Sequence, residues 1–206
     1  MVRDFLCTFA TEIKTKRAME FTDEKRKHLL GLYFGKLSEV GIPVDTLKEK
    51  YGSLLEKATY SNNIETGLAF DGSLLYAVLY KLTIYALKIN EIFPEGVRAD
   101  RTTLIKVCLL CQIGKCLMFT LNDNKWEIEK RGLLYKFVDD GLSIRVGMRS
   151  VAIANECGIT LTPQEIEMMT INDREATELD ARYHASIPAS VLRMASETVF
   201  LIHRKK

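Results

Sequence analysis

The sequence has few of the residues and motifs that mark familiar catalytic sites. Its 206 residues include only three histidines, one tryptophan and four prolines. It has no G-x-S-x-G motif and no glycine-rich turn between a strand and a helix, so it does not resemble the common serine hydrolases or nucleotide-binding enzymes. No window reaches the roughly 18 uncharged residues of a membrane span, because Lys81 interrupts the longest apolar stretch, near residues 74–87. We therefore expect no membrane partner.

An excess of charge of one sign is also missing. The chain has 29 basic and 27 acidic residues and a formal net charge of +2, which gives no support for nucleic acid as a partner. Its first residues carry charges where a signal peptide needs an uninterrupted apolar run. The cysteines number five, and their spacing is not that of a secreted disulfide domain. We expect a cytoplasmic protein with free thiols.

What is present is enough apolar sequence for one core. With 47% hydrophobic residues, the chain can bury a single domain of this size. We interpret residues 22–206 as that domain. Residues 1–21 are mixed in character, with Phe5, Phe9 and Phe21 among charges, and are interpreted as an N-terminal arm.

Hydrophobic spacing and helix caps predict an all-α fold of about 7 to 9 helices. A cap at Thr22, another at Asp100 or Thr102, and a capping box from Thr162 to Glu165 with Pro163 mark three helix starts. The predicted helices are 22–41, 44–57, 74–90, 104–119, 145–157, 163–171 and 188–202. Alternating apolar residues around Arg131-Gly132 predict one short β-hairpin at 125–137.

The most apolar window, residues 104–119, organises this prediction. Its spacing places one face in the core, comprising Leu104, Val107, Cys108, Cys111, Lys115 and Met118. Gly114 interrupts that face, because glycine costs about 1 kcal/mol inside a helix, and predicts a turn or a close backbone approach. The three cysteines of the window (Cys108, Cys111 and Cys116) lack the second pair of a zinc site, so we interpret them as core residues.

The run CLLCQIGK resembles the second metal motif of HD-domain phosphohydrolases, a leucine-rich helix that ends in His-Asp-(Ile/Leu)-(Gly/Cys)-Lys. Cys111 stands at the histidine and Gln112 at the aspartate, whereas Ile113, Gly114 and Lys115 keep the family pattern.

Further segments are similar to the family in the same order, over about residues 55–203. Asp71 to Ala77 is similar to Gly-Gly-Leu-Leu-Glu-His-Ser, and Lys125-Trp126 to the tryptophan-bearing hairpin of a subgroup common in phages and gut bacteria. Arg145 to Val151 is similar to Gly-His-Gly-Glu-Lys-Ser-Val, Leu161 to Glu165 to Leu-Thr-Asp-Glu-Glu, and 188–197 to a helix that ends in His-Ile-Ala-Asp. By this resemblance, further site positions fall on Tyr76, Val146, Asn172, Met194 and Glu197.

The resemblance implies an HD-like fold, but its site positions lack the usual ligands. Of the four metal-ligand positions, Tyr76, Cys111, Gln112 and Glu197, only Glu197 is a good ligand for a hard cation. We therefore expect no metal, no cofactor and no catalysis, and interpret the protein as a structural or interaction subunit. The resemblance suggests a phage virion as one setting, and we expect the arm 1–21 to bind a protein partner.

Two other functions remain open. A metal-free nucleotide- or phosphate-binding module would use Lys115, Arg145 and Arg149. An active metal-dependent phosphohydrolase would need unusual ligands, and is the less favoured of the two.

Overall fold

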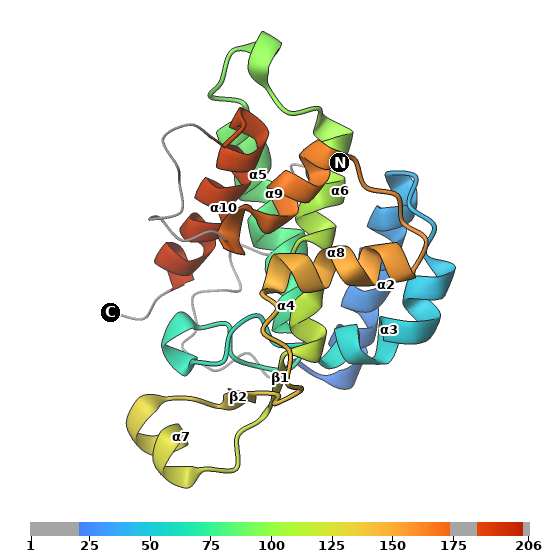
Figure 1. Cartoon of the computed structure of the whole chain (residues 1–206). Coiled ribbons are helices and arrows are strands. Elements are labelled where there is room, and N and C mark those ends of the chain that lie inside the picture. The colour runs from blue at the N-terminus through green and yellow to red at the C-terminus, as the bar shows by residue number, and fades with distance from the viewer. Residues whose placement is uncertain (1–20, 174–184, 204–206) are drawn as a thin grey trace.

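The computed structural model describes residues 21–173 and 185–203, so the predictions for residues 1–20, most of the loop 172–185 and the basic tail 204–206 lie outside the described part. The described residues are mostly helical, with one two-stranded antiparallel sheet (Figure 1). This arrangement confirms the predicted all-α fold with a short hairpin. No helix in the described ranges is long and apolar enough to cross a bilayer.

The elements follow one another in a simple order along the chain. The α-helices are α2 (Asp23–Glu39), α3 (Asp45–Lys57), α4 (Ser73–Ala77), α5 (Thr83–Asn90), α6 (Arg101–Leu110), α7 (Lys125–Arg131), α8 (Val146–Glu156), α9 (Pro163–Thr170) and α10 (Ile187–His203). Between them lie a π turn, η2 (Val78–Leu82), and short 3-10 turns at η1 (Ile64–Thr66), η3 (Glu95–Val97), η4 (Ile113–Leu117) and η5 (Ile171–Asp173). The strands are β1 (Phe119–Leu121) and β2 (Tyr135–Phe137).

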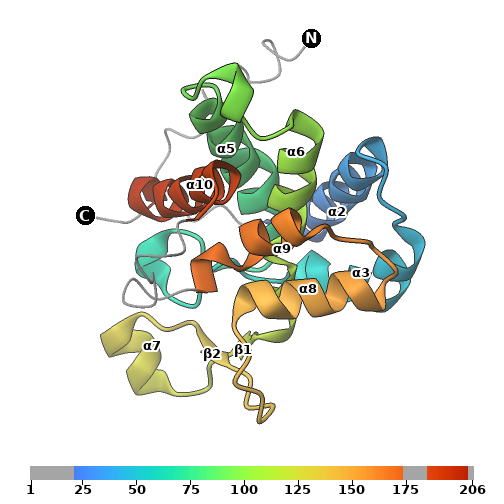
Figure 2. The ribbon, with the colours of Figure 1, turned by 45° about the horizontal axis from the view of Figure 1, so that its top comes forward.

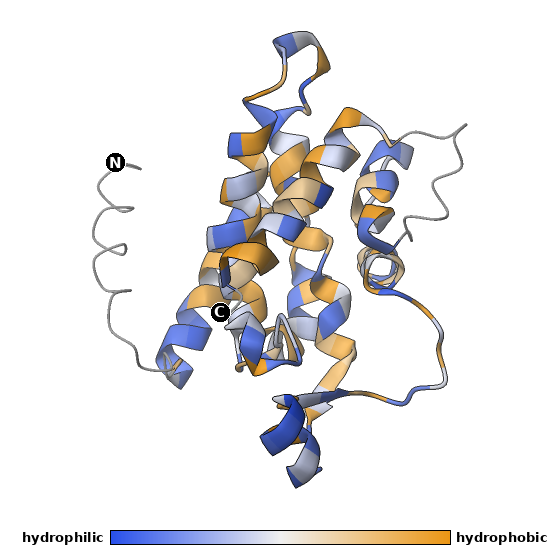
Figure 3. Ribbon diagram, turned by 90° about the vertical axis from the view of Figure 1, so that its left-hand side faces the viewer, coloured by the Kyte–Doolittle hydropathy of each residue, from blue (hydrophilic) through white to orange (hydrophobic). Residues whose placement is uncertain are grey.

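Helix α6 occupies the centre of the body. Helices α2, α5, α8, α9 and α10 pack around it (Figure 2), and their buried side chains form one apolar cluster. Leu104, Val107, Cys108 and Cys111 are fully buried, as the predicted core face requires. The Tyr33 hydroxyl on α2 donates to the Leu109 carbonyl over 3.1 Å and so ties α2 to α6. Colouring by hydropathy shows apolar residues along the helices of the body (Figure 3).

The predicted single helix over 104–119 is wrong in its second half. Helix α6 ends at Leu110 with Cys111 as its C-cap, and the chain continues through η4 into β1. The backbone of η4 passes against the start of α8 at Gly114. A Cβ atom added to this glycine would lie 2.6 Å from the Val146 carbonyl oxygen and 2.7 Å from the Arg149 Cβ. The close approach predicted for Gly114 is confirmed, and it lies in the turn that follows the helix.

The position predicted for the hairpin also needs correction. Residues 125–131 form helix α7, and β2 pairs with β1 rather than with residues 125–131. The Asn124 side chain accepts hydrogen bonds from the backbone N–H groups of Trp126 and Glu127, and Gly132 closes the helix with φ +65°. These caps act locally and outweigh the strand preference of the aromatic residues. Helix α7 therefore forms the connection between the two strands (Figure 1).

Candidate functional site

Among the lysines of residues 21–173 and 185–203, Lys115 of η4 is the one that the fold buries almost completely, with 7% of its surface exposed. Its Nζ donates a hydrogen bond to the Tyr60 carbonyl oxygen at 2.7 Å. The same nitrogen lies 3.7 Å from the centroid of the Tyr60 ring and 5.6 Å from that of Phe200 on α10. The site therefore joins three distant segments around one ammonium group.

The electrostatics of this site are set by burial. Burial lowers the pKa of Lys115 from 10.5 to about 7, because removing the ammonium from water disfavours its charged form. No carboxylate forms an ion pair with Lys115 within the described ranges. The nearby Cys111 thiol gives no counter-charge at neutral pH, since burial raises its pKa to about 12. Aromatic faces and a carbonyl thus supply the stabilisation that a carboxylate usually provides.

A buried hydroxyl adds a polar group to the same place. Tyr60 is 1% exposed, and its Oη has no hydrogen-bond partner among residues 21–173 and 185–203. Its ring also packs against Phe200, with 5.3 Å between the ring centroids. Burial raises the pKa of this hydroxyl strongly, so Tyr60 is neutral over the physiological range. The side chain therefore acts as a packing surface for Lys115.

Ser150 of α8 fixes the turn that carries Lys115. Its Oγ accepts a hydrogen bond from the Gly114 N–H at 2.9 Å and lies 3.0 Å from the Cys111 carbonyl oxygen, to which it donates. Because both contacts are buried, they replace water at the polar backbone of η4. Gly114 and Ser150 together hold η4 against α8, and this contact orients Lys115 toward Tyr60.

The residues at the family's first metal motif lie in packed surroundings. Tyr76 of α4 is buried, and its ring lies 5.7 Å from Phe21 and 5.9 Å from Tyr80. Lys81 Nζ lies 5.5 Å from the Tyr76 ring centroid. Burial raises the pKa of Tyr76, so its hydroxyl is protonated and is a poor metal ligand. Tyr76 belongs to an aromatic cluster.

Cys111 and Gln112, at the His-Asp positions, are buried beside Lys115. The Cys111 Sγ makes a 3.6 Å hydrogen bond to the Cys108 carbonyl one turn earlier in the chain. A neutral thiol and an amide do not form the anionic or imidazole donor set that a divalent cation needs. The residues present at these positions therefore do not fit a metal.

The remaining positions of the resemblance lie at the ends and on the outer faces of helices. Val146 is the first residue of α8, and the exposed Asn172 donates a hydrogen bond to the Ser196 Oγ at 3.0 Å. On α10, Met194 is partly exposed, and the exposed Glu197 pairs with Arg193, with 3.3 Å between Oε1 and Nε. Within the described residues, no hydrogen bond or ion pair joins any of these four residues to Tyr76, Cys111 or Gln112.

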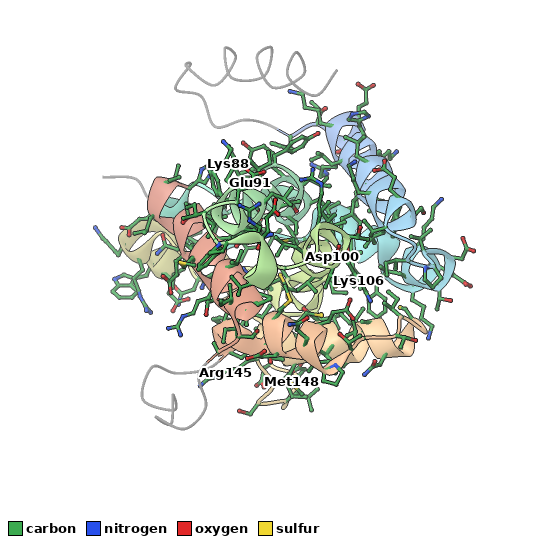
Figure 4. The ribbon with its side chains drawn as sticks, turned by 90° about the horizontal axis from the view of Figure 1, so that it is seen from above. Lys88, Glu91, Asp100, Lys106, Arg145 and Met148 are labelled. Carbon is green, nitrogen blue, oxygen red and sulfur yellow. The ribbon has the colours of Figure 1, made fainter. Side chains whose placement is uncertain are left out.

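The two arginines of the phosphate hypothesis have protein partners. Arg149 makes two bonds to the Asp140 carboxylate, at 2.6 and 3.1 Å, and others to the carbonyls of Ile144 and Leu142. This pairing holds the pKa of Asp140 at about 2. Arg145 donates to the Asp173 carbonyl, and Figure 4 shows it near Met148 at the edge of the molecule. Both arginines therefore bind groups of the protein itself.

In residues 21–173 and 185–203, no three His, Cys, Asp or Glu side chains are grouped so that they could hold a metal. Comparison with family models, with curated proteins and with solved structures finds no match for the chain. The resemblance to HD domains therefore stays a prediction, and the residues themselves carry the functional argument.

The sequence did not point to the residues that surround Lys115, or to the apolar side chains on the hairpin. Tyr60 and Phe200 are 55 and 85 residues from Lys115 in the chain, so no local pattern could join them. On the hairpin, large apolar side chains are exposed, with 69% for Leu121, 60% for Trp126 and 61% for Phe137. We call these three residues the apolar hairpin surface. The signal for it was the presence of large apolar residues in a segment rich in charge and turn residues.

Proposed function

We propose that this protein is a non-catalytic structural or interaction protein, built on a helical scaffold similar to that of HD domains. The apolar hairpin surface is the observation that carries this proposal. β1, β2 and α7 lie below the helical body (Figures 1 and 3), and their exposed side chains include Trp126 and Phe137. Aromatic side chains are enriched in protein interfaces, because they bury a large apolar area at a low cost in conformational entropy.

The surroundings of the ligand-equivalent positions favour the same function. Tyr76, Cys111 and Gln112 are buried in packed surroundings, and Glu197 is paired with Arg193. A catalytic site keeps polar groups free to meet a substrate, whereas these groups are engaged in packing and in local hydrogen bonds. The former site thus fits a scaffold better than a reaction centre.

The partner and the setting come from the resemblance. A phage virion, or the cytoplasm of a host cell, is the setting in which we place the protein. Of the arm 1–21 that was expected to bind a partner, only Phe21 lies within the described part. Its ring packs on Phe70 at 4.9 Å and on Tyr76, so this end of the arm contacts its own domain. The apolar hairpin surface is therefore our preferred contact with a partner.

Chromatography of the natural complex tests this proposal. The tagged chain, extracted from the cells or particles that contain it, should elute with another protein, at a mass above that of two copies of the chain. The double variant W126S/F137S should leave this complex. Ile92→Ser is the matched control, because Ile92 is 79% exposed on the loop after α5. Elution of the natural chain without another protein would contradict the proposal.

The two alternative functions have their own tests. For a phosphohydrolase, elemental analysis should find a stoichiometric metal, and nucleoside monophosphates should be turned over. For a phosphate-binding module, a nucleotide at 100 times its dissociation constant should stabilise the fold by about 2.7 kcal/mol in a thermal shift experiment. The engaged donors of Arg149 and the burial of Lys115 lead us to expect neither result.

A further inference from the structure

The two-stranded sheet has one covered edge and one open edge. β1 and β2 pair with Thr120 opposite Lys136. The Asn122 N–H donates to the Leu134 carbonyl at 2.9 Å, and the Val138 N–H to the Met118 carbonyl at 2.9 Å. Because inward-facing and outward-facing residues alternate along a strand, the backbone groups of Phe119 and Leu121 point away from β2.

The outer edge of β2 has partners within the protein. The Tyr135 N–H donates to the Asn62 carbonyl at 3.3 Å, and Asn63 forms a bridge with Leu133. Over the described ranges, the outward N–H and C=O groups of Phe119 and Leu121 have no hydrogen-bond partner, and Thr120 and Leu121 are exposed. β1 therefore presents an open edge.

Apart from its shortness, this open edge lacks the features that usually prevent pairing with another chain. Natural edge strands carry charged residues, proline or a bulge. Residues 116–122, Cys-Leu-Met-Phe-Thr-Leu-Asn, contain no charge and no proline. A two-stranded sheet of three residues per strand is also only marginally stable in water, and further strands would stabilise it.

We propose that β1 pairs with β1 of a second copy of the chain, antiparallel and about a two-fold axis at Thr120. The product is a four-stranded sheet in the order β2, β1, β1, β2, with one half from each copy. This inference adds a second copy to the partners of the interaction protein proposed above, and it rests on that proposal only for treating the hairpin as a contact surface.

A second copy fits this edge because the edge is self-complementary. Phe119 comes directly before Thr120 and Leu121 directly after it. With the two-fold axis at Thr120, Phe119 of each copy therefore lies opposite Leu121 of the other copy. Their outward backbone groups then form two hydrogen bonds per residue pair. Thr120 meets its own counterpart, a favourable cross-strand pair without like charges. An isologous contact of this kind closes at two copies and does not extend into a fibre.

The chemistry of the flanking residues agrees with this register. Met118 comes opposite Asn122, and the first charged residue, Asp123, comes opposite Leu117. No two like charges therefore meet along the paired strands. The contact is short, so we expect a weak dimer whose fraction depends on concentration.

Sedimentation of the purified full chain between about 1 µM and 100 µM tests the dimer. We expect the fraction of dimer to rise with concentration. Leu121→Pro should abolish the rise, because proline removes an outward N–H and leaves the bonds between β1 and β2 intact. Leu121→Val is its matched control, since it keeps the N–H and should keep the dimer. A chain that stays monomeric at every concentration would overturn the inference.

Disulfide trapping gives a second test that does not depend on the folding of the proline variant. Cys7 is first replaced by serine, so that its thiol cannot take part in the linking. In this background, Thr120→Cys places two thiols at the two-fold axis in a non-hydrogen-bonded pair, and oxidation should link the copies. Lys136→Cys is the control. Lys136 lies opposite Thr120 on β2, so its own β1 separates it from β1 of the other copy, and oxidation should not link this variant. Equal linking of the two variants would refute the register.

These tests separate this inference from the proposed function. A chain that is monomeric when pure, but that keeps its complex with another protein, overturns the second copy and leaves the interaction role intact. A chain that dimerises alone, and is found with no other protein in extracts, supports the paired β1 strands and contradicts the proposed function.

Discussion

Replacing Lys115 by methionine should change how stability depends on pH. Methionine fills a similar space without a titratable group, and Lys115 is buried beside Tyr60 and Phe200. In the folded protein its pKa is lowered from 10.5 to about 7 by burial. Between these two pH values the unfolded chain binds a proton that the folded chain has released, so the free energy of unfolding rises with pH.

The size of this effect follows from the two pKa values. With 1.36 kcal/mol for each pH interval of one, Lys115 lowers the free energy of unfolding by about 4 kcal/mol at pH 7 and by about 3 kcal/mol at pH 8.5. The contribution of Lys115 to the free energy of unfolding should therefore rise by about 1 to 2 kcal/mol over this range. The rise of the free energy of unfolding with pH ends near pH 9. The pKa values of the buried thiols Cys108, Cys111 and Cys116 are raised, so ionisation of these thiols in the unfolded chain lowers stability at higher pH.

The absolute stability at a single pH is the weaker readout. Lys115→Met removes the cost of burying a charge, but it also removes a cation–π contact of about 2 kcal/mol. It leaves the Tyr60 carbonyl without its donor as well, at a cost of about 1 to 3 kcal/mol. At pH 7 these terms nearly cancel the gain. The difference between the two pH values isolates the titration of Lys115, because the volume that methionine fills does not change with pH.

Urea unfolding at pH 7.0 and at pH 8.5, monitored by circular dichroism, measures this difference. We expect Lys115→Met to lose the gain of the natural protein. Lys27→Met should keep it, because Lys27 is an exposed lysine on α2. If Lys115→Met and the natural protein show the same change between the two pH values, the ammonium of Lys115 does not have a lowered pKa, and the reasoning is refuted.

Two further predictions concern the turn and the caps. Gly114→Ala should destabilise the fold by about 2 to 3 kcal/mol, because its Cβ would lie 2.6 Å from the Val146 carbonyl oxygen. The control variant Gly31→Ala, whose Cβ would have nothing within 4 Å, should stabilise α2 by about 0.5 to 1 kcal/mol. Equal midpoints for the two variants in urea unfolding would contradict the close approach. Thr162→Ala should cost about 1 kcal/mol, since Thr162 accepts from the Glu165 N–H and completes a capping box; Thr160→Ala, at an exposed position before the helix, should leave the thermal midpoint unchanged.

Helix starts could be predicted from the sequence because their signals are local. Caps were expected at Thr22, at Asp100 or Thr102, and at Thr162. Thr22, Asp100 and Thr162 each accept a hydrogen bond from the backbone three residues later. The same kind of signal was missed at Asn124 and Gly132, which bound α7. There the apolar alternation of residues 126–137 was given more weight than the caps, and a helix was predicted as a strand.

The site was predictable only in part. Gly114 was expected to mark a turn or a close approach, and it does. Lys115 was assigned to the core face of a helix that ends five residues before it, so its burial was predicted for the wrong reason. Its contact with Tyr60 and Phe200 depends on how α10 and the loop before α4 meet η4. Such long-range packing leaves no pattern in a single sequence.

The π turn between α4 and α5 makes the length of this segment as important as its residue types. The Thr83 backbone N–H donates to the Val78 carbonyl five residues earlier, which marks the wide turn, and the Thr83 Oγ1 donates to the same carbonyl at 2.8 Å. The residues after it are rotated by about 100° relative to an uninterrupted α-helix. With this rotation, the side chains of Leu82, Ala86 and Asn90 form one buried stripe. The Asn90 side chain also forms hydrogen bonds with both the N–H and the C=O of Ala99. Loss of one codon within 78–82 would turn this stripe toward solvent, so an insertion or deletion here would be tolerated only with compensating changes along the whole of α5.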